Sequence, residues 1–361
     1  MRVIITAGGT GGHIYPALAI VDKIKSVEPD SEFIYIGTHN RMEKDIVPAR
    51  GIKYEALEIY GLSTSLKLMG RNIKNVFLIN KAYKRCVKIM KEFKPDVVIG
   101  VGGYVTFPVI KAAHKCGVKT FIHEQNSIPG KANKMLLKYV DLVGVSFKDS
   151  MKYFEGHNVV MTGNPCGENA IKIDKISKEK YGMSKDKKAI LMFNGSLGSA
   201  TMNQKLVEFL HSIGEEDYEV LYITGKNSYN DFKDIEFPKN VFVEPYIDNL
   251  SGLMKDMDLI VSRAGASSLA EITALRIPSI LIPSPYVANN HQYYNALSIS
   301  EAEAGIMIQE SELNKESLKG AVDLILTNEY KVKTMKENLK SISVDNSQTI
   351  IYEELKKLIS K

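Results

Sequence analysis

The chain has 361 residues, 44% of them hydrophobic and 25% charged, and its formal net charge is +5. This length suits two domains of ordinary size, and the composition is that of a globular protein. No stretch approaches the roughly 18 apolar residues that a membrane-spanning helix needs, and the N-terminus lacks a secretion-signal pattern. Because the net charge is modest, we expect no nucleic-acid partner. The three cysteines lack metal-ligand spacing, which is typical of a reducing compartment.

The first predicted element is a buried strand over residues 3–6 that runs into a glycine loop. Four of the five residues at positions 8–12 are glycine, and His13 follows at the entrance of a helix. Strand, loop and helix together aim backbone N–H groups and the positive end of the helix dipole at an anion, which predicts a phosphate site; a tight turn without a ligand is the alternative. Ile14 stands where the common dinucleotide-binding pattern needs glycine, and no P-loop lysine follows, so we expect a phosphate loop of another kind.

Apolar β-rich runs then alternate with helical ones along the whole chain, as parallel strands joined by helices require. The polar region that begins at Gly163, Asn164 and Pro165 separates two such series, and each opens on a strand followed by a glycine loop. The sequence therefore predicts an α/β fold with two Rossmann-like domains facing a cleft, with ligands at the carboxyl ends of the strands. The expected strands are residues 3–6, 33–36, 97–101, 120–123, 142–145, 159–162, 190–193, 219–224, 241–244, 259–262 and 279–282.

Two further stretches in the N-terminal half follow predicted strands. Gly102, Gly103 and Tyr104 form another glycine turn after the strand at 97–101. Residues 123–126, His-Glu-Gln-Asn, end the next strand, and four polar side chains in a row are hard to place in a core. We interpret them as functional rather than structural residues.

In the C-terminal half, three stretches follow predicted strands. Gly195 and Ser196 form a second glycine loop suited to a diphosphate, with a plain helix cap as the alternative. Glu271 lies on the helix after the strand at 259–262; one carboxylate can accept from both hydroxyls of a ribose, or it can simply interact with the helix dipole. The polar cluster at residues 289–292 is either a binding loop or a capped turn.

Asp256 and Asp258 require a check, because paired aspartates can bind a metal that holds a diphosphate. They precede their strand and so lie away from the expected ligand edge, and we interpret them as a solvated helix end. Since two glycine loops are available as donors, we expect neither a metal nor a cofactor.

Together these stretches resemble the MurG family of glycosyltransferases, which attach N-acetylglucosamine to lipid I on the way to peptidoglycan. The resemblance spans nearly the whole chain and implies the two-domain fold called GT-B. In that fold residues 1–164 would be the acceptor- and membrane-facing domain, residues 165–343 the UDP-sugar-binding domain, and residues 344–361 a last helix that returns to the first domain. The matching pieces are residues 8–13, 102–104, 123–126, 163–165, 195–196 and 264–271, and the run from Gln292 through Asn295 and Ala296.

The resemblance also implies roles for single residues. The acceptor would bind at Gly102, Gly103 and Tyr104, and the donor sugar and its phosphates at Thr10, Gly11, Gly12 and Asn126. Ser196 would bind the diphosphate, Ile247 would read the uracil edge through its backbone, Glu271 would clamp the ribose, and Gln292 would contact sugar hydroxyls. Packing beside Glu271 would come from Ala266, Ser267, Ser268, Leu269 and Ala270.

The implied reaction is inverting transfer from UDP-N-acetylglucosamine to the 4-hydroxyl of lipid-linked muramic acid. A general base is expected to help, and the candidates are His13, as first choice, and Glu124. Two departures from the family pattern stand out: Gly167 occupies a position where many members carry a nucleotide-binding arginine, and His291 precedes Gln292 where some members have two glutamines. Alternatives are another UDP-sugar transferase or an epimerase on the same fold, or a non-catalytic nucleotide-sugar-binding protein at a membrane surface.

The stretch from residue 65 to 94 is strongly basic, with nine lysines or arginines against the single acid Glu92. Apolar residues interleave at helical spacing, which an ordinary amphipathic helix would also explain. A lipid-tailed acceptor must be met at an anionic surface, so we expect residues 66–88 to dock the chain peripherally on the cytoplasmic face of the membrane. The basic residues are Lys67, Arg71, Lys74, Lys81, Lys84, Arg85, Lys88, Lys91 and Lys94.

Overall fold

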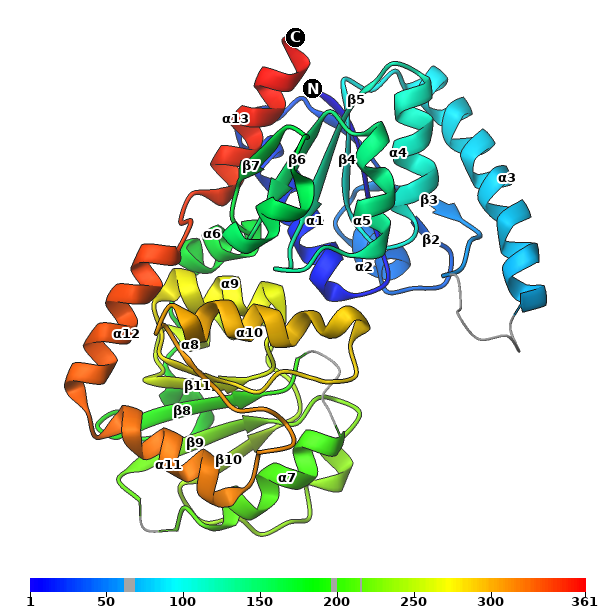
Figure 1. Cartoon of the computed structure of the whole chain (residues 1–361). Helices are drawn as coiled ribbons and strands as arrows, with labels where there is room; N and C mark the ends of the chain where they lie inside the picture. The colour runs from blue at the N-terminus through cyan, green and yellow to red at the C-terminus, as the bar shows by residue number, and fades with distance from the viewer. Residues whose placement is uncertain (62–68, 196–199, 215) are drawn as a thin grey trace. The chain divides into compact units, whose positions relative to one another are not determined.

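The computed structural model describes residues 1–61, 69–195, 200–214 and 216–361, and among these the side chains of 69–74 and 200 are left out of the description (Figure 1). The chain divides into two compact units. Unit 1 comprises Met1–Pro165 and Asn346–Lys361, and unit 2 comprises Cys166–Asp345.

Unit 1 is built on a seven-stranded parallel sheet with the strand order β3-β2-β1-β4-β5-β6-β7. The chain winds outward in one direction through β2 and β3 and in the other through β4 to β7, so the order reverses between β1 and β4. The strands are β1 (Arg2–Ala7), β2 (Glu32–Thr38), β3 (Lys53–Leu57), β4 (Val97–Gly102), β5 (Lys119–Glu124), β6 (Leu142–Val145) and β7 (Val159–Met161).

Helices cover both faces of this sheet, which is why its strands are apolar on both sides. Val3 and Ile5 of β1 pack into one buried cluster with α1 and α13, whereas Ile4 packs into a second cluster with α3 and α4. The helices are α1 (Gly11–Val27), α2 (Glu43–Ala49), α3 (Met69–Phe93), α4 (Thr106–Lys115), α5 (Lys131–Leu136) and α13 (Ser347–Ile359), with short 3-10 helices at Leu137–Tyr139 and Lys148–Phe154.

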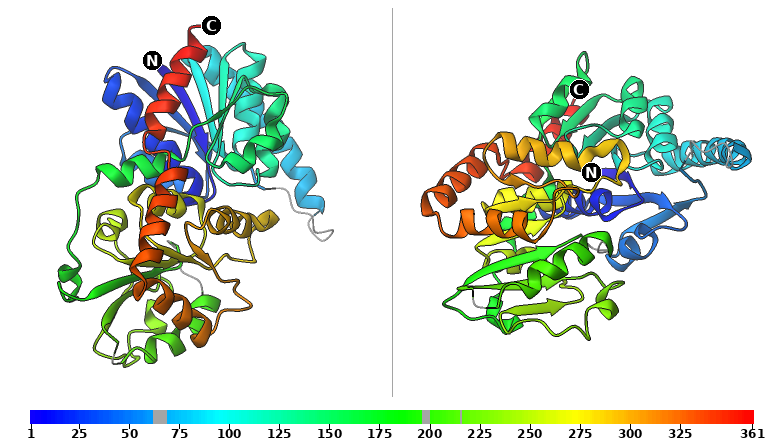
Figure 2. Two further views of the ribbon diagram at one scale, coloured as in Figure 1. Left: turned by 60° about the vertical axis from the view of Figure 1, so that its left-hand side comes forward. Right: turned by 60° about the horizontal axis from the view of Figure 1, so that its bottom comes forward.

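The last helix of the chain, α13, packs on α1 (Figure 2). Its Ile351, Leu355 and Leu358 are buried in the cluster that α1 shares with the sheet. At one end, Ser347 Oγ donates to the Asn164 carbonyl at 3.0 Å. At the other, Lys356 Nζ lies 2.9 Å from Glu28 Oε1. Apolar burial therefore attaches this segment to unit 1, and polar contacts fix it at both ends.

Unit 2 repeats the plan with six parallel strands in the order β10-β9-β8-β11-β12-β13. The order again reverses beside the first strand, between β8 and β11. The strands are β8 (Lys188–Phe193), β9 (Tyr218–Ile223), β10 (Val241–Glu244), β11 (Leu259–Ser262), β12 (Ser279–Leu281) and β13 (Ile306–Met307). Two parallel, doubly wound sheets confirm the predicted pair of Rossmann-like domains.

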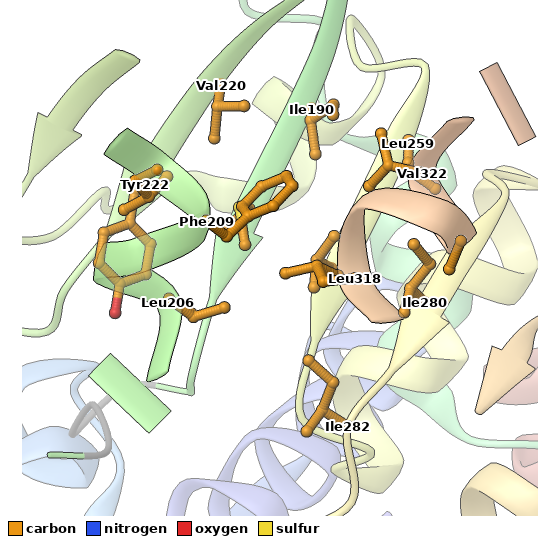
Figure 3. Packing of buried hydrophobic residues seen from close by; sticks show 14 of the residues in the cluster. Ile190, Leu206, Phe209, Val220, Tyr222, Leu259, Ile280, Ile282, Leu318 and Val322 are labelled. Carbon is orange, nitrogen blue, oxygen red and sulfur yellow. The ribbon is translucent and has the colours of Figure 1, made fainter. Parts of the chain in front are cut away.

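The larger core of unit 2 lies between the sheet and helices α7 and α11 (Figure 3). Phe209 from α7 and Leu318 from α11 pack there against Ile190, Val220 and Leu259 of the strands, while α8 and α9 cover the other face. The helices are α6 (Pro165–Lys172), α7 (Ala200–His211), α8 (Leu250–Met254), α9 (Ala266–Leu275), α10 (His291–Glu301), α11 (Lys315–Leu326) and α12 (Glu329–Ile342), with 3-10 helices at Lys178–Tyr181, Tyr229–Asp231 and Ala288–Asn290.

Candidate functional site

The first glycine loop of unit 1 lies at the point where the strand order reverses. The Gly8 N–H, just after β1, donates to the Gly102 carbonyl at the end of β4 at 3.2 Å, so the two loops touch. A crevice at the carboxyl ends of strands, where the order reverses, is the usual ligand position in such sheets.

Close approach explains why these loops need glycine. A Cβ on Gly103, whose φ is +86°, would lie 2.4 Å from the Gly8 carbonyl oxygen. A Cβ on Gly102, whose φ is +116°, would lie 2.5 Å from His13 Cδ2. Tyr104 follows as a partly buried side chain. The residues expected to bind an acceptor, Gly102 and Gly103, are thus packed against the loop that carries His13.

His13 lies in the first turn of α1, and its ring has a defined tautomer. The exposed Thr10 begins the helix, and its carbonyl accepts from the N–H groups of His13 and Ile14 at 3.1 and 3.2 Å. The His13 Nδ1 lies 3.1 Å from the Gly8 carbonyl oxygen. Because a carbonyl only accepts, Nδ1 carries the proton, and in the neutral ring Nε2 is the atom that can take up another.

The polar run at 123–126 is largely interior, which corrects our expectation that it would not fit a core. His123, Glu124 and Gln125 are all buried, and His123 and Gln125 hydrogen-bond each other. Gln125 Nε2 donates to His123 Nδ1 at 2.9 Å, and His123 Nε2 donates to the Gly163 carbonyl at 2.9 Å. Burial lowers the pKa of His123 to about 4, so this ring is a neutral structural group.

The carboxylate of Glu124 is occupied by donors. Its Oε1 accepts from the backbone N–H and the side-chain amide of Asn126 at 3.0 and 3.2 Å. Its Oε2 accepts from the Gly130 N–H at 3.0 Å and from Asn133 Nδ2 at 2.8 Å. Glu124 therefore shapes the loop that presents Asn126, and four donors leave it poorly suited to take up a proton from a substrate.

In unit 2 the corresponding edge carries the second glycine loop. Gly195 has φ +84°, and a buried network lies beneath it, in which Asn194 Nδ2 donates to Asn203 Oδ1 at 2.7 Å and to the Tyr222 hydroxyl at 3.2 Å. Ser196, our expected diphosphate ligand, lies outside the described residues. The described part of the loop is thus a glycine turn above a buried polar network.

Glu271 lies on α9, the helix that follows β11, and its side chain is partly buried. Burial raises the pKa of Glu271 to about 7, and a hydrogen bond from the Ser251 side chain opposes that shift. A carboxyl with a perturbed pKa at the ligand edge of a sheet is a candidate binding group.

The other residues of unit 2 that were expected to bind the donor lie around the same edge. Gln292 lies in the first turn of α10, and its Oε1 accepts from the Ser284 N–H at 2.9 Å. Ile247 is buried in the loop after β10 and packs with the cluster under α8 and α9. The first turn of α9 contains Ala266, Ser267, Ser268, Leu269 and Ala270, and of these Ala266 and Leu269 are buried.

Unit 2 contains a buried ion pair that the sequence did not predict. Arg263 follows β11, and its Nη2 lies 2.5 Å from Glu310 Oε2, with both side chains only 7% exposed. Arg263 Nη1 also donates to the Ile282 carbonyl at 3.2 Å. The pair thus connects the loops after β11, β12 and β13. In the sequence, the signal that could have indicated it is an arginine between a buried strand and a glycine turn.

Gly167 has a packing reason for being glycine. A Cβ there would lie 3.0 Å from the Ala270 carbonyl oxygen and 3.3 Å from the Ala274 Cβ, because α6 crosses α9 closely. An arginine at this position would need the two helices to separate. The departure from the family pattern is therefore accompanied by tight helix packing.

Asp256 and Asp258 follow the short helix α8, as expected of a helix end; Asp258 is exposed and Asp256 is partly buried. Asp256 Oδ2 accepts from the Lys178 N–H at 2.9 Å, and its Oδ1 lies 2.5 Å from Lys175 Nζ. Asp258 Oδ2 accepts from the Ala189 N–H at 2.8 Å. Within the described part of the chain, no three His, Cys, Asp or Glu side chains gather as a metal ion would need.

The comparisons with known proteins agree with this geometry. Residues 3–145 match the glycosyltransferase family 28 N-terminal domain, and residues 189–350 match its C-terminal domain. The chain is 44% identical to the UDP-N-acetylglucosamine--N-acetylmuramyl-(pentapeptide) pyrophosphoryl-undecaprenol N-acetylglucosamine transferase of Bacillus subtilis, over 99% of this chain and 100% of that protein. It is 42% identical to transferase 1 of the same name from Bacillus cereus, over the full length of both.

Among solved structures, the fold is similar to that of MurG from Acinetobacter baumannii. The TM-score is 0.79, with 24% sequence identity, and the match covers 99% of each chain.

Proposed function

Because this chain belongs to the MurG family of glycosyltransferases, we propose that it transfers N-acetylglucosamine from UDP-N-acetylglucosamine to the 4-hydroxyl of the muramic acid of lipid I, forming lipid II for peptidoglycan. The observation that carries this proposal is the 44% identity along 99% of the chain to a transferase of that name. An epimerase, a transferase for another sugar or a non-catalytic binding protein would share the fold, but the full-length relatives named above favour none of them.

His13 is the proposed general base. As the acceptor oxygen attacks the anomeric carbon of the sugar, the bond from that carbon to the diphosphate oxygen breaks, and the configuration inverts. The hydroxyl proton moves to His13 Nε2, the ring atom left unprotonated when Nδ1–H binds the Gly8 carbonyl. A positioned base of this kind contributes typically ~10²–10⁴-fold. Glu124, our second candidate, is not proposed, because four donors already occupy its oxygens.

Unit 2 is proposed to bind the nucleotide and unit 1 the acceptor. Glu271 would accept from the two ribose hydroxyls, Ile247 would present backbone groups to uracil, and Gln292 would contact the sugar. Departing UDP gains negative charge, which backbone N–H groups at a helix N-terminus can stabilise without a metal. Other proposed donor contacts are Thr10, Gly11, Gly12, Asn126, Ser196, Ala266, Ser267, Ser268, Leu269 and Ala270, and proposed acceptor contacts are Gly102, Gly103 and Tyr104.

We also propose that unit 1 docks on an anionic membrane surface through α3. The described part of this helix buries Ala82, Cys86 and Met90, as an amphipathic helix should, yet Val76 is 52% exposed and Phe77 72% exposed. Exposed Lys81, Lys84 and Lys88 continue along the helix from Phe77 at intervals of four, three and four residues. Apolar side chains beside lysines suit an interfacial helix. Among the described helices, none is both long and apolar enough to cross a membrane.

The test of the proposed activity is UDP release from a panel of UDP-sugars, with and without lipid I. Release should need both UDP-N-acetylglucosamine and lipid I, and the product should be lipid II. Release with no acceptor, or equal release from several UDP-sugars, would contradict the proposal.

His13→Ala should lower turnover by about 10²-fold or more, because the base is lost, while the free energy of unfolding changes by less than about 1 kcal/mol. Steady-state rates and urea unfolding of the same preparations measure the two effects. Near-normal turnover would remove His13 from the mechanism.

A further inference from the structure

Glu43 is a buried carboxylate beneath the glycine loop that carries His13. It begins α2, shortly after β2, and its side chain is fully buried. Its Oε1 accepts from the Thr38 N–H at 3.0 Å and from the Thr38 hydroxyl at 2.6 Å. Its Oε2 accepts from the Gly9 N–H at 3.3 Å. All of these partners are donors, so both oxygens act as acceptors, as those of an ionised carboxylate do.

One peptide group connects this carboxylate to the proposed base. The Gly8 carbonyl accepts from His13 Nδ1 at 3.1 Å, and the N–H of the same peptide group, that of Gly9, donates to Glu43 Oε2. The sequence of contacts is therefore imidazole N–H to carbonyl, then amide N–H to carboxylate. Hydrogen bonds arranged in such a chain polarise one another.

Glycines make room for this arrangement. A Cβ on Gly8 would lie 2.6 Å from Glu43 Oε1, and a Cβ on Gly37 would lie 2.7 Å from Glu43 Cγ. Any other residue at either position would push the carboxylate away from the loop. Glycine at one position just after β1 and at one position on β2 thus leaves room for one buried acid under the Gly8–Gly9 peptide.

We propose that Glu43 is a positioning residue for His13, acting through the Gly8–Gly9 peptide to hold the Nδ1–H tautomer and to raise the basicity of Nε2. The inference rests on the proposed role of His13 as base. A carboxylate bound to an imidazole N–H orients the ring and stabilises its protonated form, and here one peptide group stands between the two. The negative charge of Glu43 makes the Gly8 carbonyl a stronger acceptor, and that favours the imidazolium.

Two phenols, one buried and one partly buried, and a buried histidine lie on strands of the sheet beside Glu43. Tyr35 of β2 and Tyr54 of β3 face the carboxylate, and burial, with the Glu43 charge, raises the pKa of both phenols, so they stay neutral. Tyr54 also donates to the Thr38 carbonyl at 2.6 Å. On β5, His123 has a pKa of about 4.

The test compares Glu43→Gln with Thr38→Val. In Glu43→Gln, the amide oxygen satisfies the two Thr38 donors, so its NH₂ faces the Gly9 N–H and the chain of hydrogen bonds breaks. Thr38→Val removes one hydrogen bond to the same carboxylate but leaves its charge and its contact with Gly9. The midpoint of the His13 titration is measured by NMR on the full chain with labelled histidine, the His13 signal being the one lost in His13→Ala.

Glu43→Gln should lower the pKa of His13 by about 1 unit, because a nearby negative charge no longer favours the imidazolium. The acidic limb of the kcat/KM profile should move to lower pH by the same amount. The plateau kcat should fall by about 3- to 10-fold, since the base is weaker, with KM for UDP-N-acetylglucosamine little changed. Thr38→Val should leave the His13 midpoint near that of the parent.

An unchanged His13 midpoint in folded Glu43→Gln overturns the proposal, as does an equal shift in Thr38→Val. If the His13 midpoint shifts but the pH profile of activity does not, Glu43 is connected to His13 as proposed, and His13 is not the base. The proposed function can therefore fail independently of the inference about Glu43. If Glu43→Gln does not fold, the Gly9 amide of the parent protein decides: its ¹⁵N shift should titrate with the His13 midpoint, and a Gly9 signal that does not move overturns the inference.

Discussion

Burial raises the pKa of Glu271, so that its carboxyl changes protonation state near neutral pH. The carboxyl has a pKa of about 7 because of desolvation, so it is mostly protonated at pH 6 and mostly ionised at pH 8. A protonated carboxyl has lost part of its capacity to accept, whereas a ribose diol offers two donors. Nucleoside binding at this residue should therefore depend on pH.

Uridine should bind more tightly as pH rises from 6 to 8, with the dissociation constant improving by up to about tenfold per pH unit below 7. Uridine is the probe because it has no phosphate that titrates in this range. Glu271→Gln should weaken binding by about 1–3 kcal/mol and flatten the pH dependence. Isothermal titration at several pH values measures both.

The control for this prediction is 2′-deoxyuridine, which lacks one of the two hydroxyls. The parent protein should prefer uridine over the deoxy compound at pH 8, and Glu271→Gln should lose most of that preference. Equal discrimination by both proteins would place the ribose contact elsewhere.

At the residue scale, the sequence indicates candidates but not which of them share a hydrogen-bond network. His13 is recognisable because glycines surround it at a helix entrance. Glu43 carries no such signal, since it stands in an ordinary charged stretch, and only the fold brings it under Gly9. The burial of His123 and Gln125 was not predicted, because each is the partner that makes the other tolerable in a core.

At the scale of elements, strong apolar runs were predictable, at the sheet edges β7 and β10 as well as inside the sheets, whereas two other edge strands were not. Each of the eleven expected strands corresponds to an observed one, with ends shifted by up to two residues. The two missed strands, β3 and β13, lie at sheet edges. β3 includes Lys53 and Glu55, and β13 has two residues, so neither shows the pattern of a strand buried on both faces.

Gly167→Ala should destabilise unit 2 by about 1–3 kcal/mol, because its Cβ must push α6 away from α9. The matched control is Gly320→Ala in α11, where a Cβ meets nothing within 4 Å; it should stabilise the protein by up to about 1 kcal/mol through helix propensity. Urea unfolding measures both. If the two substitutions have the same effect, the close crossing of α6 and α9 is not what requires glycine.

The attachment of α13 to unit 1 should depend on acid pH through Glu28. Its carboxylate hydrogen-bonds Lys356, and that contact, opposed by desolvation and aided by Tyr352 and the N-terminal amine, lowers the pKa of Glu28 to about 2. A lowered pKa means that the unfolded chain binds more protons below pH 4.5, so this stabilisation is complete above about pH 4.5 and is lost as pH falls towards 2.

Glu28→Gln should therefore lower the free energy of unfolding at pH 7 by about 1–2 kcal/mol. This value allows for screening by solvent, because the Glu28 side chain is about a quarter exposed. The difference from the parent should shrink as pH falls below about 4.5. Urea unfolding at pH 7, 5 and 3.5 tests this, with Glu353→Gln on α13, whose side chain is exposed, as the control. A difference that stays constant with pH would assign the effect to packing.

At the scale of the whole molecule, charge is nearly balanced, with 47 basic and 42 acidic residues, but its distribution is not. Nine of the basic residues fall between positions 65 and 94 against one acid. Among the described side chains of this stretch, Arg85 contacts Glu55 at 2.6 Å and Lys88 contacts Glu92 at 3.6 Å. An uneven distribution on a nearly neutral chain favours a directed encounter with an anionic surface.

Binding to vesicles should therefore require anionic lipid and fall steeply with salt. Each lysine near such a surface is worth about 1 kcal/mol, so changing Lys81, Lys84 and Lys88 together to Glu should weaken co-sedimentation by about 100-fold or more, while UDP binding is retained. Phe77→Ser should weaken it further, because the most exposed apolar side chain in the described part of α3 is removed. The same charge change at Lys333, Lys336 and Lys340 of α12, which are also exposed, should have little effect. Salt-insensitive binding, or equal loss in the α12 variant, would mean that α3 is an ordinary surface helix.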